Sequence, residues 1–329
     1  MTVEAPQTAG DPIAAAKGTR LLRLIATGLV LFVAVYVAIV LFLGFDEVLD
    51  GLRQLSLSDW ALLIALSTVH FAFRFARWKL YLETLGHRVG WVDNLLTYLS
   101  GFALTTTPGK VGEVWRAVYL KPHGVGPADV FASFFAERYT DLLAIMLLSC
   151  LALGLYEGPL WPVALVAGVA VGIILVLRLS FIPKIMEARA GHGLIGGALR
   201  GAARMLRGSA VLLTPRLTGA ALALALIAWG LHGLMLWIIL DLQGHQVGLW
   251  VAIGIYAVGL LAGALSFIPG GLGSTEAVII GLLYLSGIET QDAATATLIC
   301  RVATLWFAVA VGFLAMGGLE LRRAARASA

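Results

Sequence analysis

Two short Pro-Gly stretches interrupt this chain where its apolar runs would otherwise continue as membrane helices. The first runs from Pro108 to Arg116 and the second from Pro269 to Val278. Proline lacks an amide hydrogen and clashes with the preceding turn, and glycine loosens the backbone, so neither stretch can continue a helix. Inside hydrocarbon, a break is tolerated only where protein or a water-filled cavity receives the freed backbone groups. Both stretches therefore predict the lining of an internal site.

The composition is that of a membrane protein. Hydrophobic residues make up 60% of the 329 residues and charged residues 13%, whereas soluble domains have about 45–50% apolar and about 25% charged residues. We therefore expect an all-α polytopic membrane protein. Cys150 and Cys300 lie in separate apolar runs, so we expect neither a disulfide framework nor a metal site, and we expect no cofactor and no nucleic acid partner.

Segment length separates full spans from half-spans. The segments expected to cross the bilayer are Leu21–Phe45, the run that starts at Trp60, Phe131–Tyr156, Leu160–Leu177, Leu217–Leu240 and Ala293–Leu319. After each Pro-Gly break, the return arms Val111–Leu120 and Ala277–Ser286 have about ten residues, or about 15 Å, against a hydrocarbon core of about 30 Å. The sequence thus predicts six full spans plus two re-entrant broken-helix hairpins whose tips lie near the midplane. The hairpin breaks are Pro108, Gly109 and Gly112 in the first and Pro269, Gly270, Gly271 and Gly273 in the second.

Basic residues predict the orientation. They precede the first span and dominate the loop 178–216, and such loops stay on the cytoplasmic side. We expect both termini in the cytoplasm of a bacterium, with the protein in its cytoplasmic (inner) membrane. Arg200, Arg204 and Arg207 share one helical face in this loop, which favours a helix on the anionic leaflet. A soluble lipid-modifying enzyme as partner of this loop, and a homo-oligomer, are both left open.

The order of elements predicts an inverted-topology repeat. Residues 19–157 and 158–321 each contain two spans, a hairpin and a span, flanked by a disordered tail (1–18) and a second cytoplasmic tail (322–329). The spacing from Pro108 to Arg138 is close to that from Pro269 to Arg301. Many transporters build a midplane binding site from such halves. Chance similarity of two Pro-Gly breaks is the alternative.

Embedded charges are the candidate substrate-binding residues. A charge at the bilayer centre costs at least about 2.5–3.5 kcal/mol, so these residues need partners or water. The set is Arg74, Arg77, Lys110, Glu113, Arg116, Glu137, Arg138, Asp141, Glu276 and Arg301. Its surplus of basic residues suits an anionic ligand, and the return helices would point their N-terminal amides at the same region. A closed ion-pair network that only holds helices together is the alternative.

Several of these motifs together resemble the membrane (flippase) domain of the lysyl-phosphatidylglycerol synthetase/flippase family. They are Arg-x-x-Arg-Trp from Arg74 to Trp78, Pro-Gly-Lys-x-Gly-Glu-x-x-Arg from Pro108 to Arg116, Glu-Arg-x-x-Asp from Glu137 to Asp141, Pro-Gly-Gly-Leu-Gly-x-x-Glu from Pro269 to Glu276, and Arg301. The resemblance covers nearly the whole chain from about residue 20. It implies movement of a lipid between leaflets, in a stand-alone form without the aminoacyl-transferase domain.

The leading functional hypothesis is a lipid flippase or transporter with no enzymatic activity. Its membrane-lipid substrate would be an anionic or modified phospholipid, or a polyprenyl-linked lipid. The alternative is a membrane-embedded glycosyl- or acyltransferase that acts on a polyprenyl-phosphate or a phospholipid, for which the acidic loop Asp46–Asp50 is the candidate catalytic feature. A scaffold that recruits a lipid-modifying enzyme is a third hypothesis.

Overall fold

The computed structural model describes residues 55–105, 113–155 and 181–327, together with a few isolated positions. The predicted first span, the disordered tail, the acidic loop Asp46–Asp50 and all but isolated positions of Leu160–Leu177 lie outside the described residues. The breaks at Pro108, Gly109 and Gly112 and the candidate site residue Lys110 also lie outside them.

Within the described residues every regular element is helical. The α-helices are α3 (Leu57–Thr84), α4 (Trp91–Ser100), α5 (Arg116–Leu120), α6 (Pro127–Ser149), α8 (Phe181–Ala188), α9 (Leu194–Leu212), α10 (Pro215–Leu242), α11 (Leu249–Leu265), α12 (Ser274–Leu285), α13 (Thr290–Arg301) and α14 (Phe307–Ala327). Short 3₁₀ turns include η1 (Gly101–Leu104), η3 (Lys121–His123), η4 (Cys150–Leu155) and η5 (Pro269–Gly271), and the π-turn η6 (Val302–Trp306) joins α13 to α14. The predicted all-α class is confirmed.

Three described helical segments are long and apolar enough to cross a membrane. They are α3, α10 and the continuous run of α13, η6 and α14 from Thr290 to Arg326. α3 begins at Ser56, whose side chain accepts a hydrogen bond from the Asp59 amide while Asp59 caps the Ser56 amide in return, an arrangement that satisfies amides left free at a helix start. These helices support the membrane-protein class.

The second Pro-Gly stretch breaks the helix as predicted. α11 ends at Leu265, and the chain passes through Gly270, Gly271 and Gly273, all with positive φ, before α12 begins. Residues with a Cβ rarely adopt this conformation, so glycine is needed there. α12 has 12 residues and is about 18 Å long, well short of a bilayer core. It begins at Ser274, three residues before the predicted return arm.

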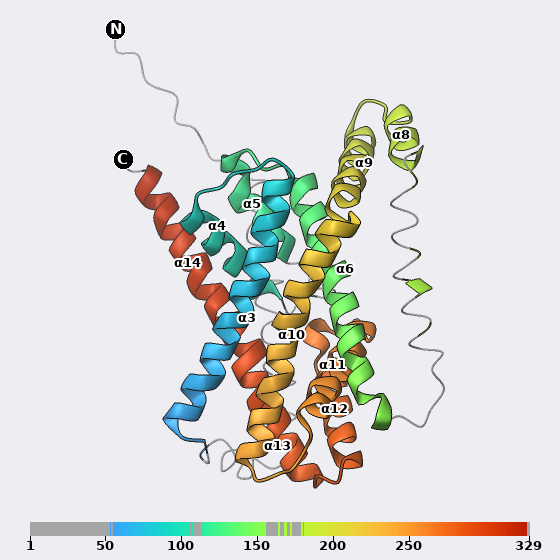
Figure 1. Ribbon diagram of the computed structural model, residues 1–329. Coiled ribbons are helices and arrows are strands. Elements are labelled where there is room, and N and C mark those ends of the chain that lie inside the picture. The colour runs from blue at the N-terminus through green and yellow to red at the C-terminus, as the bar shows by residue number, and fades with distance from the viewer. Residues whose placement is uncertain are drawn as a thin grey trace.

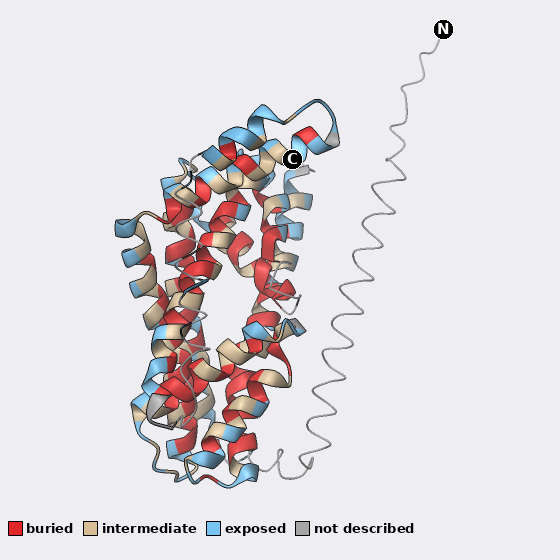
Figure 2. Ribbon diagram, turned by 90° about the vertical axis from the view of Figure 1, so that its right-hand side faces the viewer, coloured by how far each residue is buried: buried red, intermediate tan, exposed pale blue. Residues whose placement is uncertain are grey.

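The described helices that flank the two Pro-Gly stretches lie toward opposite ends of the molecule (Figure 1). Figure 1 shows α4 and α5 at the end that also carries α8, α9 and the C-terminus, and α11 to α13 at the other end. α3 and α10 run between these ends and pack against each other. The buried residues are concentrated along the inner faces of the helices, with exposed residues at the loops and outer faces (Figure 2).

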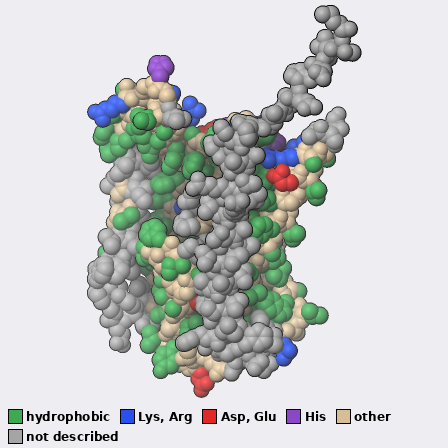
Figure 3. Space-filling view, turned by 180° about the vertical axis from the view of Figure 1, so that it is seen from behind, with side chains coloured by type: hydrophobic (Ala, Val, Ile, Leu, Met, Phe, Trp, Pro, Cys, Tyr) green, Lys and Arg blue, Asp and Glu red, His purple; other side chains and the backbone are tan. Residues whose placement is uncertain are grey.

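The outer flank is apolar between two polar ends. On the face in Figure 3, hydrophobic side chains cover the sides, and most of the Lys and Arg side chains in view lie at one end. The basic loop forms α8 and α9 at that end, and Arg200, Arg204 and Arg207 are exposed on α9. α9 also packs on α6, and its residue Leu212 belongs to a buried cluster with Ala132 and Ala136 of that helix.

Gly312 allows α14 to approach η1 closely. A Cβ at Gly312 would lie 2.1 Å from the Ala103 backbone nitrogen, whereas nothing lies within 4 Å of a Cβ at Gly317 on the same helix. Overpacking against backbone costs about 1–3 kcal/mol, whereas Ala in an exposed helix position gains about 0.5–1 kcal/mol over Gly. We therefore expect Gly312→Ala to lower the thermal stability of the detergent-solubilised protein and Gly317→Ala to preserve or raise it. Equal stability of the two variants would contradict the close packing.

Candidate functional site

A buried cluster of charges joins α3, α6 and the segment at α5. Its described members are Arg74 and Arg77 on α3, Glu113 and Arg116 after the first break, and Glu137, Arg138 and Asp141 on α6. All are buried except Arg138, whose side chain is 21% exposed. Arg74 and Arg77 are three positions apart on α3, and on α6 Asp141 follows Arg138 by three positions and Glu137 by four, so those of each helix share one face.

Asp141 ties three helices together. Its Oδ1 accepts from Arg77 Nη2 on α3 at 2.6 Å and from the Trp229 indole on α10 at 2.9 Å, and its Oδ2 lies 3.0 Å from Arg138 Nη2. Charge-assisted hydrogen bonds of this length are among the strong ones. The aspartate on α6 therefore links this helix to α3 and α10.

Arg116, just after the first Pro-Gly stretch, forms an ion pair with α6. Its guanidinium lies 3.1 Å from Glu113 and 3.1 Å from Glu137, and it stacks over the Tyr98 ring at 4.4 Å. A Cβ at Gly101 would lie 2.3 Å from Arg116 Nε, so glycine at this position makes room for the guanidinium. The carboxylate of Glu113 also accepts from Thr105 at 3.1 Å, which links the two arms on either side of the break.

Arg301 likewise pairs with a glutamate and with the backbone at the second break. Its Nε lies 2.6 Å from Glu276, and its Nη2 donates to the Gly270 carbonyl at 2.9 Å. Glu276, in the first turn of α12, in turn accepts from the Gly273 amide at 2.7 Å. The backbone groups freed by this break are therefore received by side chains, as the cost of leaving them unpaired requires.

The same pairing recurs in both halves of the chain. In the first half Glu113, after the Pro-Gly break, lies 3.7 Å from Arg138 on α6. In the second half Glu276 pairs with Arg301 in the same order along the chain. Each glutamate that follows a Pro-Gly stretch thus lies against an arginine further along the chain, on α6 or at the end of α13.

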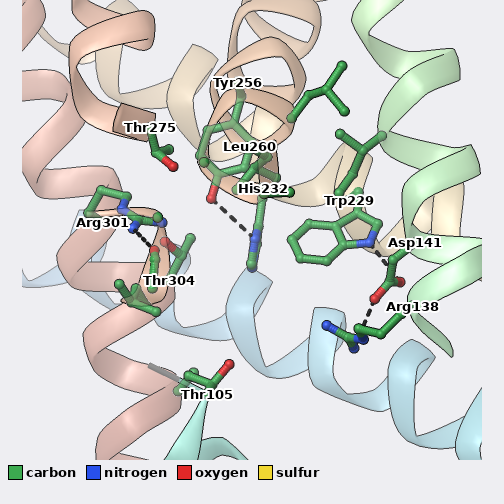
Figure 4. A pocket seen from close by; sticks show the side chains of 18 of the residues that line it. Thr105, Arg138, Asp141, Trp229, His232, Tyr256, Leu260, Thr275, Arg301 and Thr304 are labelled. Carbon is green, nitrogen blue, oxygen red and sulfur yellow. Dashed lines mark hydrogen bonds and ion pairs between the residues drawn. The ribbon is translucent and has the colours of Figure 1, made fainter. Parts of the chain in front are cut away.

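A cavity of about 300 Å³ is lined by Thr105 and Thr107, which precede the first break, and by residues of the second break. Its charged lining consists of Arg74, Arg138, Asp141 and Arg301, and Gly270 and Gly271 of the second break also contribute. Figure 4 shows Arg138 and Asp141 on one side of it and Arg301 with Thr304 on the other. Three guanidinium groups and one carboxylate are among the described residues that line it, and Glu113 and Glu276 pair with those arginines from outside the lining. Counted over all described members of the charge cluster together with Arg301 and Glu276, the five arginines exceed the four carboxylates by one, and this positive charge is suited to an anion.

The predicted site residues therefore divide into two groups. Arg74, Arg138, Asp141 and Arg301 line the cavity. The other described members, Arg77, Glu113, Arg116, Glu137 and Glu276, are not among its lining residues; they pair with one another or with the lining residues.

Sequence reasoning missed the aromatic part of the cavity. His70, Trp229, His232 and Tyr256 line it together. The rings of His70 and His232 are stacked, with centroids 3.7 Å apart and an interplanar angle of 17°. One histidine within each of two apolar helices was a visible signal, because ionisable residues inside a membrane are expensive and usually functional. Their pairing across α3 and α10 was not visible.

Comparison with known proteins finds a matching family model and similar membrane proteins. Residues 25–312 match the family described as "Lysylphosphatidylglycerol synthase TM region". The chain is also similar to proteins named "UPF0104 membrane protein" from the archaeon Methanothermobacter thermautotrophicus. One is 22% identical over 88% of this chain and 93% of its own length. Another is 26% identical over 86% of this chain and 91% of its own length.

Proposed function

We propose a function for this chain from the premise that it belongs to the lysylphosphatidylglycerol synthase transmembrane-region family. This family and the apolar helices give a membrane protein with a lipid-related role. The proposed function is a flippase: it moves an anionic or modified phospholipid head group between leaflets through the polar cavity, while the acyl chains stay in the bilayer.

The charge of the cavity carries this proposal. Among the described residues, Arg74, Arg138 and Arg301 line it together with one carboxylate, Asp141. The other carboxylates of the cluster pair with these arginines and still leave a surplus of one positive charge. Arginine holds phosphate with two parallel hydrogen bonds, which makes it the preferred side chain for this group. A volume of about 300 Å³ equals that of roughly ten waters in the liquid, which suits a head group and excludes a whole lipid.

The proposed architecture is the inverted repeat of six spans and two re-entrant hairpins, with both termini cytoplasmic and the repeat boundaries expected from the sequence. It is supported by the helices that flank the two Pro-Gly stretches, which lie toward opposite ends of the molecule (Figure 1), and by the recurring glutamate–arginine pair. Such halves make one site accessible from either side of a membrane. The basic end of the molecule (Figure 3) would face the cytoplasm.

The predicted substrate-binding residues receive two roles in this proposal. The residues that line the cavity contact the head group, and their buried partners hold the guanidinium groups in position. Lys110, next to the first break, would join the first group. A bacterial inner membrane stays a prediction, and so do an enzyme partner at the basic loop and a homo-oligomer.

Reconstitution tests the proposal directly. Purified protein is placed in vesicles that carry a fluorescent phosphatidylglycerol, a fluorescent phosphatidylcholine or a polyprenyl phosphate analogue, and a membrane-impermeant quencher reports the fraction in the outer leaflet. We expect the fraction of anionic lipid quenched to exceed that in protein-free vesicles, with Arg200→Gln, on the exposed face of α9, as active as the unaltered chain. Protein that moves no lipid but transfers sugar or acyl groups would establish the transferase alternative instead.

A further inference from the structure

We propose that the stacked pair His70 and His232 is a proton-binding site that takes up one proton when an anionic head group enters the cavity. The inference rests on the proposed function and adds a co-substrate to it: protons would accompany the lipid. It is carried by the geometry of the pair, by the hydrogen bond of His70 and by the charges that surround both rings.

The pair lies at the cavity and is shielded from bulk solvent. His70 is 1% exposed and His232 is 5% exposed, and both line the cavity. Their rings stack with centroids 3.7 Å apart. Figure 4 shows His232 between Trp229 and Tyr256, facing the same space as Arg301.

A backbone contact sets the tautomer of His70. Its Nδ1 lies 2.7 Å from the carbonyl oxygen of Ala228 on α10. A carbonyl only accepts, so Nδ1 carries the proton of the neutral ring. A second proton can arrive only at Nε2, and it turns His70 into a cation that donates from both nitrogens. His232 Nδ1 lies 3.4 Å from the Tyr256 hydroxyl, which can donate to it or accept from it.

The surrounding charges couple this proton to an anion. The charged and titratable groups around the pair are Arg74 on α3, Arg138 and Asp141 on α6 beside Trp229, Tyr256 on α11, and Cys300 and Arg301 on α13. The described carboxylates, including Glu113 and Glu276 behind the lining, leave the charge cluster with a surplus of one positive charge. A proton on the pair adds a second positive charge beside the cavity, and a bound phosphate supplies a compensating negative charge. By linkage, the bound proton raises the affinity for the anion by the same factor by which the bound anion raises the affinity for the proton.

The stacking limits the uptake to one proton. Two imidazolium rings at 3.7 Å would be like charges in close contact, which disfavours the doubly charged state. The pair therefore titrates as a unit that holds one extra proton.

The position of the pair in the proposed repeat suggests how proton binding would be coupled to lipid transport. His70 precedes the Pro108 break by nearly the same distance as His232 precedes the Pro269 break. The two rings are thus equivalent positions of the halves, and they meet where a head group would pass from one half to the other. A proton bound there with the lipid from one side and released to water on the other would couple transport to a proton gradient.

Proton uptake on lipid binding is the direct test. Water-soluble dihexanoylphosphatidylglycerol is added to the protein in weakly buffered detergent, and an indicator dye reports proton uptake while calorimetry reports binding. The phosphodiester stays singly charged between about pH 5 and 8, where histidine titrates, so any uptake belongs to the protein. We expect an uptake that approaches one proton per bound lipid, and an affinity that rises up to tenfold for each pH unit lowered, as linkage to one proton requires.

Variants assign the proton to the pair. The double variant His70→Gln/His232→Gln, which removes both rings that could hold the proton, is expected to bind the lipid with less than about twofold change in affinity per pH unit. His192→Gln, in the exposed turn before α9, is the control that keeps the full pH dependence. Lipid binding by the unaltered protein without proton uptake would overturn this inference and leave the proposed function intact. Absence of any anionic lipid binding would overturn both.

Discussion

Arg301→Gln is expected to slow transfer of anionic lipid by about 10-fold to 100-fold. The arginine lines the cavity, and among the described lining residues it is the one arginine from the second half of the chain. A hydrogen bond to a charged group contributes about 1.5–3 kcal/mol, which corresponds to this loss. Arg301→Lys keeps the charge but loses the two-pronged contact with phosphate, so an intermediate rate is expected. The measurement is quenching of fluorescent phosphatidylglycerol in reconstituted vesicles.

The control for this prediction separates lost contact from lost folding. Arg301→Gln leaves Glu276 without the guanidinium that lies 2.6 Å away, and an unpaired buried charge is destabilising. The double variant Arg301→Gln/Glu276→Gln removes both charges and should recover stability while transfer stays slow. Recovery of transfer in the double variant, or wild-type transfer by a folded single variant, would show that Arg301 supports only the helix break.

Asp141→Asn is expected to destabilise the folded protein by about 3–5 kcal/mol, the usual cost of removing one member of a buried ion pair. Asparagine can still accept from Trp229, but the buried Arg77 at 2.6 Å loses its countercharge. The loss would appear as a lower midpoint in thermal unfolding of the detergent-solubilised protein. The matched control is Asp241→Asn, at the exposed end of α10, which should change the midpoint little.

A second substitution tests whether the pair itself is responsible. If Arg77→Gln is added to Asp141→Asn, the stranded cation disappears, and the double variant should lose less stability than the sum of the two single variants. Residues in one ion-pair network commonly show coupling of about 0.5–3 kcal/mol. Additive losses would mean that the contact between Arg77 and Asp141 contributes little to folding.

The broken helix could be anticipated because its cause is local. A proline and three glycines within Pro269–Gly273 cannot be accommodated in a regular helix whatever surrounds them, and the structure ends α11 and starts α12 on either side of them. The membrane class likewise follows from composition, which needs no knowledge of contacts. The helix boundary was predicted less well. α12 starts three residues earlier than predicted, because the Glu276 side chain accepts a hydrogen bond from the Gly273 amide.

The neighbouring residues Arg74 and Arg77 show what remained undetermined. Both are buried arginines on α3, and local rules place them on one polar stripe. In the structure Arg74 lines the cavity, while Arg77 turns to Asp141. The difference depends on where α6 and α10 pack against α3, and no local pattern contains that information.

The sequence by itself determined the all-helical membrane class, the break at Pro269 and the family motifs, because composition and backbone restrictions act within a few residues. Only the tertiary structure decided which charges line the cavity and which act as their partners, and only it brought His70 against His232. The physical reason is that ion pairs and ring stacking act over a few ångströms, so their partners are set by the packing of helices that lie far apart in the chain.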